Sequence, residues 1–143
     1  MAKNYKNIVL DPKYVPKKTD KYMSDDMKAY FYNMLVGQRA ELIASIEGNI
    51  SALSESINID DADGPDDDGD KSMMTQQADT QMKMLDRDKN MLDKIDSALE
   101  RLEKNTFGYS VISGAQIGIK RMLAQPLATM TVEEREEYEA KEI

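Results

Sequence analysis

Two stretches of this sequence carry apolar residues at alternating steps of three and four, and no other feature constrains the fold as strongly. The first set is Ile43, Ile46, Ile50, Leu53 and Ile57, and the second is Leu85, Leu92, Ile95, Leu99 and Leu102. Such spacing places each set on one face of a helix, as at the a and d positions of a coiled coil. Each helix would span about 30 residues, or roughly 45 Å. Two apolar faces of similar length can cover each other, so the sequence predicts a mainly α fold built on a long antiparallel coiled-coil hairpin.

The segment between the two stretches is strongly acidic. Residues 60–70 hold seven carboxylates and no basic side chain, so they carry −7 of the formal net charge of −8. Two glycines and a proline in the same run interrupt helices. We therefore expect an acidic tip loop over residues 59–72 that joins the two arms. A solvated loop would explain the run, but like charges gathered at the end of a stiff arm repel one another, which favours a binding function.

The acidic run only partly matches a calcium loop. An EF-hand that begins at Asp66 would place Asp68 and Asp70 at ligand positions. Lys71 then stands where the motif needs glycine, and Gln77 where it needs glutamate. We therefore exclude an EF-hand, while weak binding of divalent cations by the cluster stays open.

Composition excludes several classes of protein. The chain has no cysteine and no histidine, so it cannot form a disulfide, a Cys/His zinc site or a thiol nucleophile. We expect no enzyme, because carboxylates on an exposed loop lack the burial that would separate their pKa values into an acid and a base. The excess of 27 acidic over 19 basic residues argues against direct binding of DNA or RNA, which needs a net-basic face. No apolar run approaches the roughly 20 residues that span a bilayer, and no signal pattern opens the chain, so we expect a cytoplasmic protein, without membrane contact.

The residues outside the hairpin predict a small second part. Ser24 is a suitable N-cap for the first arm, and Thr131 with Glu134 forms a capping box for a last helix. Residues 105–131 are rich in glycine, small polar and β-favouring residues, and they predict a turn-rich α/β module with short strands. We divide the chain into an N-terminal segment, the hairpin, this module and a C-terminal helix, at residues 1–23, 24–104, 105–131 and 132–143.

We call the contact between the two predicted apolar helix faces the seam of the hairpin. Apolar residues outside it suggest how the rest of the chain packs. The module is too small to be stable alone without a metal or disulfides, so we expect it to borrow stability from the hairpin and the N-terminal segment. The residues of that segment that would cover it are Tyr5, Ile8, Val9, Leu10, Tyr14 and Val15. The second arm also carries several methionines, which suit adaptable packing, with a soft partner-binding surface as the alternative. These are Met73, Met74, Met82, Met84 and Met91.

Several short motifs lie before the first arm, on the second arm and in the module. They are Lys21-Tyr22-Met23, Leu85-Asp86-Arg87-Asp88, Lys94-Ile95, Phe107-Gly108-Tyr109 and Ile117-Gly118-Ile119-Lys120-Arg121-Met122-Leu123-Ala124-Gln125-Pro126. With these motifs the chain resembles the DksA/TraR family of bacterial transcription factors, and its DksA branch in particular, over residues 22–139. The resemblance implies a hairpin with an acidic tip and a module that resembles a zinc finger.

The resemblance also indicates candidate site residues. The family's tip motif, Asp-x-x-Asp-x-Ala, falls on Asp67, Asp70 and Ser72, with serine in place of alanine. The family's four zinc-binding cysteines fall on Ser110, Ser113, Thr131 and Glu134. Because these residues cannot form the cysteine site, the chain resembles the cysteine-free, zinc-independent members, and we expect no bound metal.

The function implied by the resemblance is regulation of transcription. Such a protein binds RNA polymerase directly, and its tip enters the secondary channel to modulate initiation without covalent chemistry. Members of this branch respond to guanosine tetraphosphate (ppGpp), the effector of the stringent response, at the junction with polymerase. The basic residues that match this junction are Arg87, Lys94 and Arg135, with Arg121 as a further basic position. We expect the chain to act as a monomer.

Two other classes of protein share parts of this pattern. A Gre-type transcript-cleavage factor also has a hairpin with an acidic tip, but too few residues follow the second arm for the larger β-rich domain of that family. An acidic coiled-coil adaptor, or a weak divalent-cation-binding protein with no role in transcription, also fits the hairpin. Binding to core RNA polymerase would separate these hypotheses.

Overall fold

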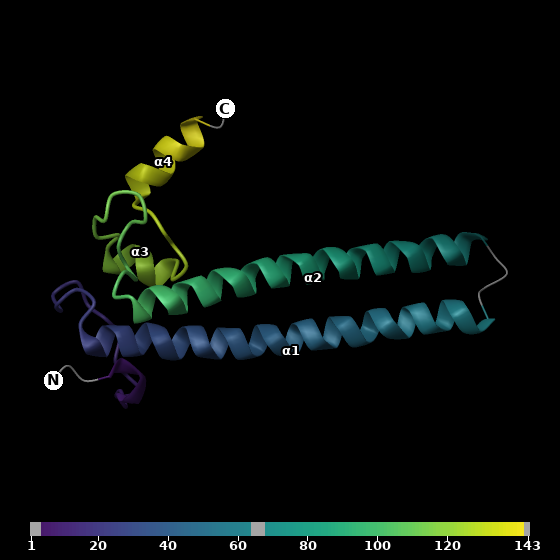
Figure 1. Ribbon diagram of the computed structural model, residues 1–143, viewed down its shortest axis with the longest axis horizontal. Helices are drawn as coiled ribbons and strands as arrows, with labels where there is room; N and C mark the ends of the chain where they lie inside the picture. The colour runs from purple at the N-terminus through teal and green to yellow at the C-terminus, as the bar shows by residue number, and fades with distance from the viewer. Residues whose placement is uncertain (1–3, 64–67, 142–143) are drawn as a thin grey trace. The chain divides into compact units, whose positions relative to one another are not determined.

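The computed structural model describes residues 4–63 and 68–141, and it leaves the side chains of residues 56–63, 68–72 and 74 undescribed. The elements in chain order are η1 (Tyr5–Asn7), α1 (Asp25–Asp63), α2 (Asp68–Glu103), α3 (Ile119–Ala124) and α4 (Val132–Lys141) (Figure 1). They form two compact units, a terminal unit of Met1–Gly37 with Ile95–Ile143, and a central unit of Gln38–Lys94. Each long helix contributes residues to both units. The mainly α fold with two long packed helices confirms the prediction.

Helix α1 begins where the sequence predicts. The backbone N–H of Met27 donates to Ser24 Oγ at 3.3 Å, so Ser24 satisfies one of the amide groups that a helix N-terminus leaves unpaired. Asp25 and Asp26 lie in the first turn, where the helix dipole favours negative charge. This local chemistry confirms the predicted N-cap.

Both long helices continue into the segment where the sequence predicts a tip loop. Helix α1 runs to Asp63 and α2 begins at Asp68, so the helical residues leave a narrower break than the expected 59–72. The end of α1 coincides with the Gly64-Pro65 pair, and the residue before a proline is disfavoured in helices. At the start of α2, acidic residues suit the first turn, which explains why the carboxylates of the run do not by themselves stop a helix.

The helical seam of the central unit differs in one respect from the predicted one. On α2, Leu85 is buried and Leu92 half-buried, as expected, but the seam position between them is taken by Asp88, which is 7% exposed. Asn49 on α1 is half-buried, whereas Ile50 is 46% exposed. The predicted place of Ile50 in the seam is therefore wrong, and Asn49 lies there instead.

A polar contact explains this change of register. The hydroxyl of Ser45 and the side-chain amide of Asn49 both donate to Asp88 Oδ2, at 3.2 and 3.4 Å. A carboxylate in a helical seam is costly unless hydrogen-bond donors face it. The three-and-four pattern also fits Leu42, Ile46 and Asn49, and in this register both donors reach the carboxylate. The other predicted residue of this stretch, Ile57, has no described side chain.

The core of the terminal unit is formed by α1, α2, α3 and the module, whereas η1 and α4 contribute no buried residue. The largest fully buried side chains are Met27, Phe31, Leu35, Leu102 and Met122. The ring of Phe31 on α1 packs against Phe107 of the module, with centroids 5.2 Å apart. Ile95 on α2 is buried as well, as its place in the predicted seam requires. The module thus shares its core with the long helices, as expected for a small unit without metal or disulfides.

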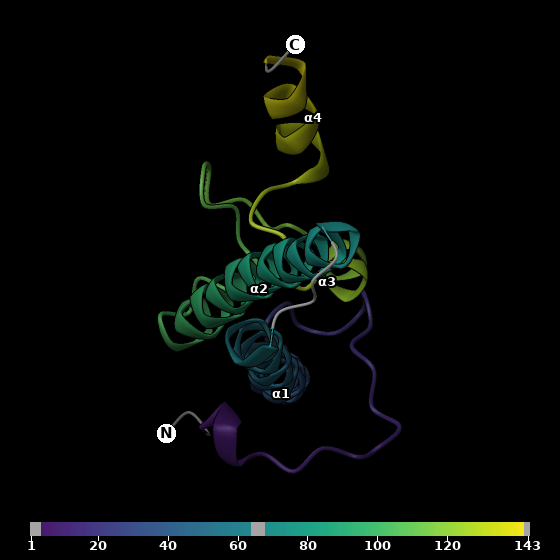
Figure 2. The same ribbon diagram turned by 90° about the vertical axis from the view of Figure 1, so that its right-hand side faces the viewer.

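The N-terminal segment covers α1 through two tyrosines. Tyr5 and Tyr14 pack edge-on against Tyr32 and Tyr30, with ring centroids 5.5 and 6.1 Å apart. Figures 1 and 2 both place η1 beside α1. Val9 is 96% exposed and Val15 is also exposed, so these two predicted covers are wrong.

The module is built of turns more than of strands. Among the described residues, the predicted short strands are represented by one antiparallel bridge, between Tyr109 and Gln116. Gly108 has φ +86, and a Cβ at this position would lie 2.5 Å from Met23 Cε, so only glycine fits here. Helix α3 follows at Ile119, and α4 begins at Val132. Within residues 4–63 and 68–141, no helix has the length and apolar character needed to cross a membrane.

Four methionines of α2 lie at the surface and outside the core. Met73, Met82, Met84 and Met91 are all exposed. The packing interpretation is therefore wrong for these four, whereas the side chain of Met74 is not described. Met73, Met84 and Met91 are 11 and 7 residues apart, spacings that place them near one face of a helix.

Candidate functional site

The predicted acidic tip falls largely outside what the structure describes. Asp67 lies outside the described residues. Asp70 and Ser72 lie in the first turns of α2, but their side chains are not described. The assignment of these three residues to the tip motif stays a prediction. Weak cation binding by residues 60–70 stays one as well.

Two of the predicted basic residues share one face of α2. Arg87 and Lys94 are seven residues apart, which is close to two helical turns, and both side chains are exposed in the central unit. An arginine offers bidentate contacts to a phosphate, and a lysine offers a mobile point charge. This face of α2 therefore has the chemistry to bind an anionic group.

The other two predicted basic residues belong to the terminal unit. Arg121 on α3 is half-buried, and its Nε donates to the carbonyl of Met130 at 3.1 Å. Arg135 on α4 is exposed and forms an ion pair with Glu139 at 3.0 Å. Arg121 is thus held by the backbone, whereas Arg135 has only a surface ion pair, which contributes little to stability.

The four positions that match the family's zinc ligands are connected by hydrogen bonds. Ser110, 5% exposed, donates from Oγ to Glu134 Oε2 at 2.9 Å. The same Oγ accepts the backbone N–H groups of Ile112 and Ser113, at 3.1 and 3.3 Å. Thr131 contributes through the capping box, in which its N–H donates to Glu134 Oε1 at 3.0 Å and its Oγ1 accepts the N–H of Glu134 at 3.2 Å. The predicted capping box is therefore confirmed.

The carboxylate of Glu134 is the centre of this hydrogen-bond network. The hydrogen bond from the backbone N–H of Thr131 lowers the pKa of Glu134, partial burial of the carboxylate opposes this effect, and the hydrogen bond from the Ser110 hydroxyl lowers the pKa further. A charged carboxylate thus ties residues 110–113 to the start of α4. The capping box is visible in the sequence, but the contact between Ser110 and Glu134 is not, because the two residues lie 24 positions apart.

The structure offers no alternative metal site in the part of the chain that it describes. Among the residues whose side chains are described, 4–55, 73 and 75–141, no group of three or more acidic side chains is arranged to hold a metal ion. The serine, threonine and glutamate of the network donate and accept hydrogen bonds among themselves instead.

Comparison with known proteins places the chain in a family. No family model matches it. It is 30% identical, over 131 residues, to the RNA polymerase-binding transcription factor DksA of Caulobacter vibrioides, across 90% of this chain and 87% of that protein. It is 25% identical, over 120 residues, to the DksA protein of Escherichia coli K12, across 84% and 76% of the two chains. The structure of transcription factor DksA2 from Pseudomonas aeruginosa superposes with a TM-score of 0.75 at 36% identity, covering 85% of this chain and 89% of that one. With this identity over nearly its whole length, and with the fold shared as well, the chain belongs to the DksA family.

Proposed function

We propose that this protein is a transcription regulator that binds RNA polymerase directly and acts without covalent chemistry. The observation that carries the proposal is the 30% identity to a DksA protein over 90% of the chain. The shared fold with DksA2 supports it. Binding to a protein and not to DNA also fits the net charge of −8, because a DNA-binding surface needs a net basic face. We further propose that the chain acts as a monomer in the cytoplasm.

The acidic tip is the proposed point of action. Residues 60–70 carry −7 and join the ends of α1 and α2. We infer that the tip enters the secondary channel of polymerase, where Asp67 and Asp70 meet basic side chains and bound Mg²⁺. Coulomb attraction is several-fold stronger at an effective dielectric constant of about 20 than in water, and Mg²⁺ prefers carboxylate oxygens. Such contacts would disturb open promoter complexes and so modulate initiation.

The tip proposal is tested with two double variants that remove the same amount of negative charge from different positions of the acidic run. We expect Asp67→Asn with Asp70→Asn to abolish most of the effect on transcription in vitro from a ribosomal-type promoter. The control is Asp60→Asn with Asp61→Asn, which removes the same charge from the same run and should keep most of the effect. Equal activity of the first variant and the unchanged protein would refute the proposal. A pull-down with core RNA polymerase separates the regulator from the acidic adaptor, which would not be retained.

The proposed effector is ppGpp, bound where the protein meets polymerase. Arg87 and Lys94 on one face of α2 supply a bidentate donor and a point charge, and Arg135 and Arg121 supply further positive charge. Phosphate groups shared between the two proteins would raise their affinity for each other only while the nucleotide is bound.

Lys94→Ala tests the role of this basic face. We expect ppGpp binding to the complex with polymerase to weaken about tenfold, because one charge-assisted contact to phosphate is lost. The control is Lys89→Ala, an exposed lysine of α2 on a different face. The measurement is a titration of labelled ppGpp into the complex. Undiminished binding by Lys94→Ala would remove this residue from the effector site.

A further inference from the structure

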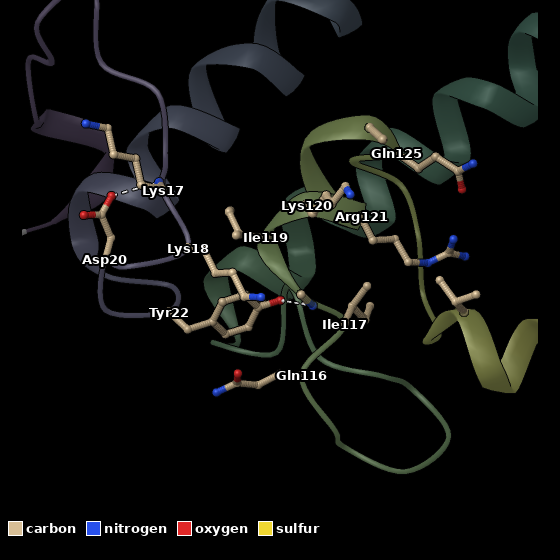
Figure 3. Close-up of a pocket in the computed structure, with 13 residues that line it drawn as sticks. Lys17, Lys18, Asp20, Tyr22, Gln116, Ile117, Ile119, Lys120, Arg121 and Gln125 are labelled. Carbon is tan, nitrogen blue, oxygen red and sulfur yellow. Dashed lines mark hydrogen bonds between the residues drawn. The ribbon is translucent and has the colours of Figure 1, made fainter.

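A pocket in the terminal unit has no part in the function proposed above, apart from its one shared residue, Arg121. Its volume is about 690 Å³, within the range of about 300 to 1,000 Å³ that is typical of small-molecule sites. Its walls come from the segment before α1, from residues 116–125 and from Val132 at the start of α4 (Figure 3). Tyr22, Ile117, Ile119 and Val132 give it an apolar lining on which the body of a small molecule can rest.

Hydrogen bonds hold the walls of this pocket in place. The hydroxyl of Tyr22 donates to the carbonyl of Gly108 and accepts the N–H of Gly118 at 3.1 Å. The turn before α1 is closed by the N–H of Asp20, which donates to the carbonyl of Lys17 at 3.0 Å. The N–H of Lys17 in turn donates to Asp20 Oδ2 at 2.9 Å. A pocket whose frame is already formed avoids part of the ordering cost of binding.

The charges around the pocket are unbalanced. Lys17, Lys18, Lys120 and Arg121 line it, and Asp20 is the one acidic residue among the lining residues. Figure 3 shows Lys17 at the edge of the group of residues that line the pocket. In the chain as far as it is described, the three lysine ammonium groups have no ion-pair or hydrogen-bond partner, and Arg121 uses only Nε, toward the carbonyl of Met130.

Two lysines elsewhere in the same unit do find carboxylates. Lys6 pairs with Glu103 at 2.8 Å, and Lys104 pairs with Glu100 at 2.7 Å. Four cations thus gather at one pocket against a single carboxylate, in a chain that has 27 acidic residues against 19 basic ones. An anion that enters the pocket would gain their attraction without displacing an existing ion pair.

We propose that this pocket binds a small phosphorylated organic molecule. The apolar or aromatic part of the ligand would lie against Tyr22 and Ile119, and its phosphate groups would lie among Lys18, Lys120 and Arg121. The terminal nitrogens of an arginine suit a phosphate in bidentate geometry. Several cations favour a ligand with more than one negative charge. This binding involves the free chain alone and does not rest on contact with polymerase.

The test is calorimetric titration of the full-length chain without polymerase, with adenosine diphosphate, pyrophosphate and a hexaglutamate peptide as probes. We expect saturable binding of adenosine diphosphate at one site, weakening as salt is added. Pyrophosphate should bind more weakly because it lacks the organic body. Lys18→Gln with Lys120→Gln should weaken binding of adenosine diphosphate about tenfold, whereas Lys18→Arg with Lys120→Arg should retain it. Lys13→Gln, on the same segment but outside the pocket, is the matched control.

Several outcomes would overturn the proposal. One is the lack of saturable binding of adenosine diphosphate, and another is an equal loss in Lys13→Gln, which would indicate diffuse charge attraction. Tighter binding of hexaglutamate would assign the surface to an acidic protein segment, and equal binding of pyrophosphate would remove the role of the apolar wall. Thermal unfolding of each variant checks that the fold is kept. Because polymerase is absent, a negative result here leaves the proposed function standing.

Discussion

Asp88 shows how one residue can control the pairing of two long helices. It occupies a seam position of α2, 7% exposed, and its donors are Ser45 and Asn49 on α1. A polar residue at such a position costs stability but fixes the register of a coiled coil, because a shifted register leaves it without partners. The register of α1 against α2 in turn decides which residues of the two helices lie opposite each other in the central unit.

Asn49→Leu should lower the free energy of unfolding by about 1 to 3 kcal/mol, because the buried carboxylate loses a donor. The double variant Asn49→Leu with Asp88→Leu should regain this loss, since two apolar side chains then face each other. Urea unfolding measures both. Ile50→Val, at an exposed neighbour, is the control and should change stability by less than about 0.5 kcal/mol. A double variant as unstable as Asn49→Leu would contradict this account of Asp88.

At the scale of elements, α4 is attached to the module through one carboxylate. Glu134 caps its own helix through Thr131 and accepts a hydrogen bond from Ser110. Its pKa in the folded protein lies below the ordinary value of 4.5. The stability that it contributes is therefore present above that ordinary value and is lost as the pH falls through the lower, folded value.

Glu134→Gln should lower the thermal midpoint at neutral pH, because a neutral amide accepts hydrogen bonds more weakly than a carboxylate. In acid, below the folded pKa, the variant and the unchanged protein should approach the same midpoint. Glu133→Gln, at the exposed neighbour on α4, is the control and should not alter the pH profile. Thermal unfolding followed by circular dichroism across this pH range provides the measurement, and a midpoint difference independent of pH would count against the role given to Glu134.

The terminal unit is held together by packing and hydrogen bonds. Met27 and Phe31 of α1, Leu102 of α2 and Met122 of α3 are fully buried together. A module of fewer than about 40 residues usually needs a metal or disulfides, and here the long helices supply the missing core. Phe31 and Phe107, with centroids 5.2 Å apart, connect the module to α1 directly.

A chelator should therefore leave the thermal midpoint unchanged, whereas Phe31→Ala should lower the free energy of unfolding by about 3 to 5 kcal/mol. The cause in the second case is the cavity left between α1 and the module. Calorimetry with and without EDTA measures the first effect, and denaturant unfolding measures the second. A fall of the midpoint in EDTA would show that a metal contributes to stability after all.

Much of this protein is determined by short-range chemistry that the sequence displays. The N-cap at Ser24 and the capping box of Thr131 with Glu134 depend on residues three positions apart, and the arms follow from apolar spacing within single helices. The shared face of Arg87 and Lys94 follows from helical geometry in the same way. The motifs on these elements were sufficient to indicate the family.

Tertiary structure decided what depends on residues far apart in the chain. The apolar pattern placed Ile50 in the seam, whereas the structure places Asn49 there, as a donor to Asp88. The contact between Ser110 and Glu134 and the pocket shared by Lys18 and Lys120 arise when separate segments meet. Apolar periodicity and capping residues indicate the stability of a single helix. The contacts named above depend on desolvation and hydrogen bonding between elements, and these arise only once the chain has packed.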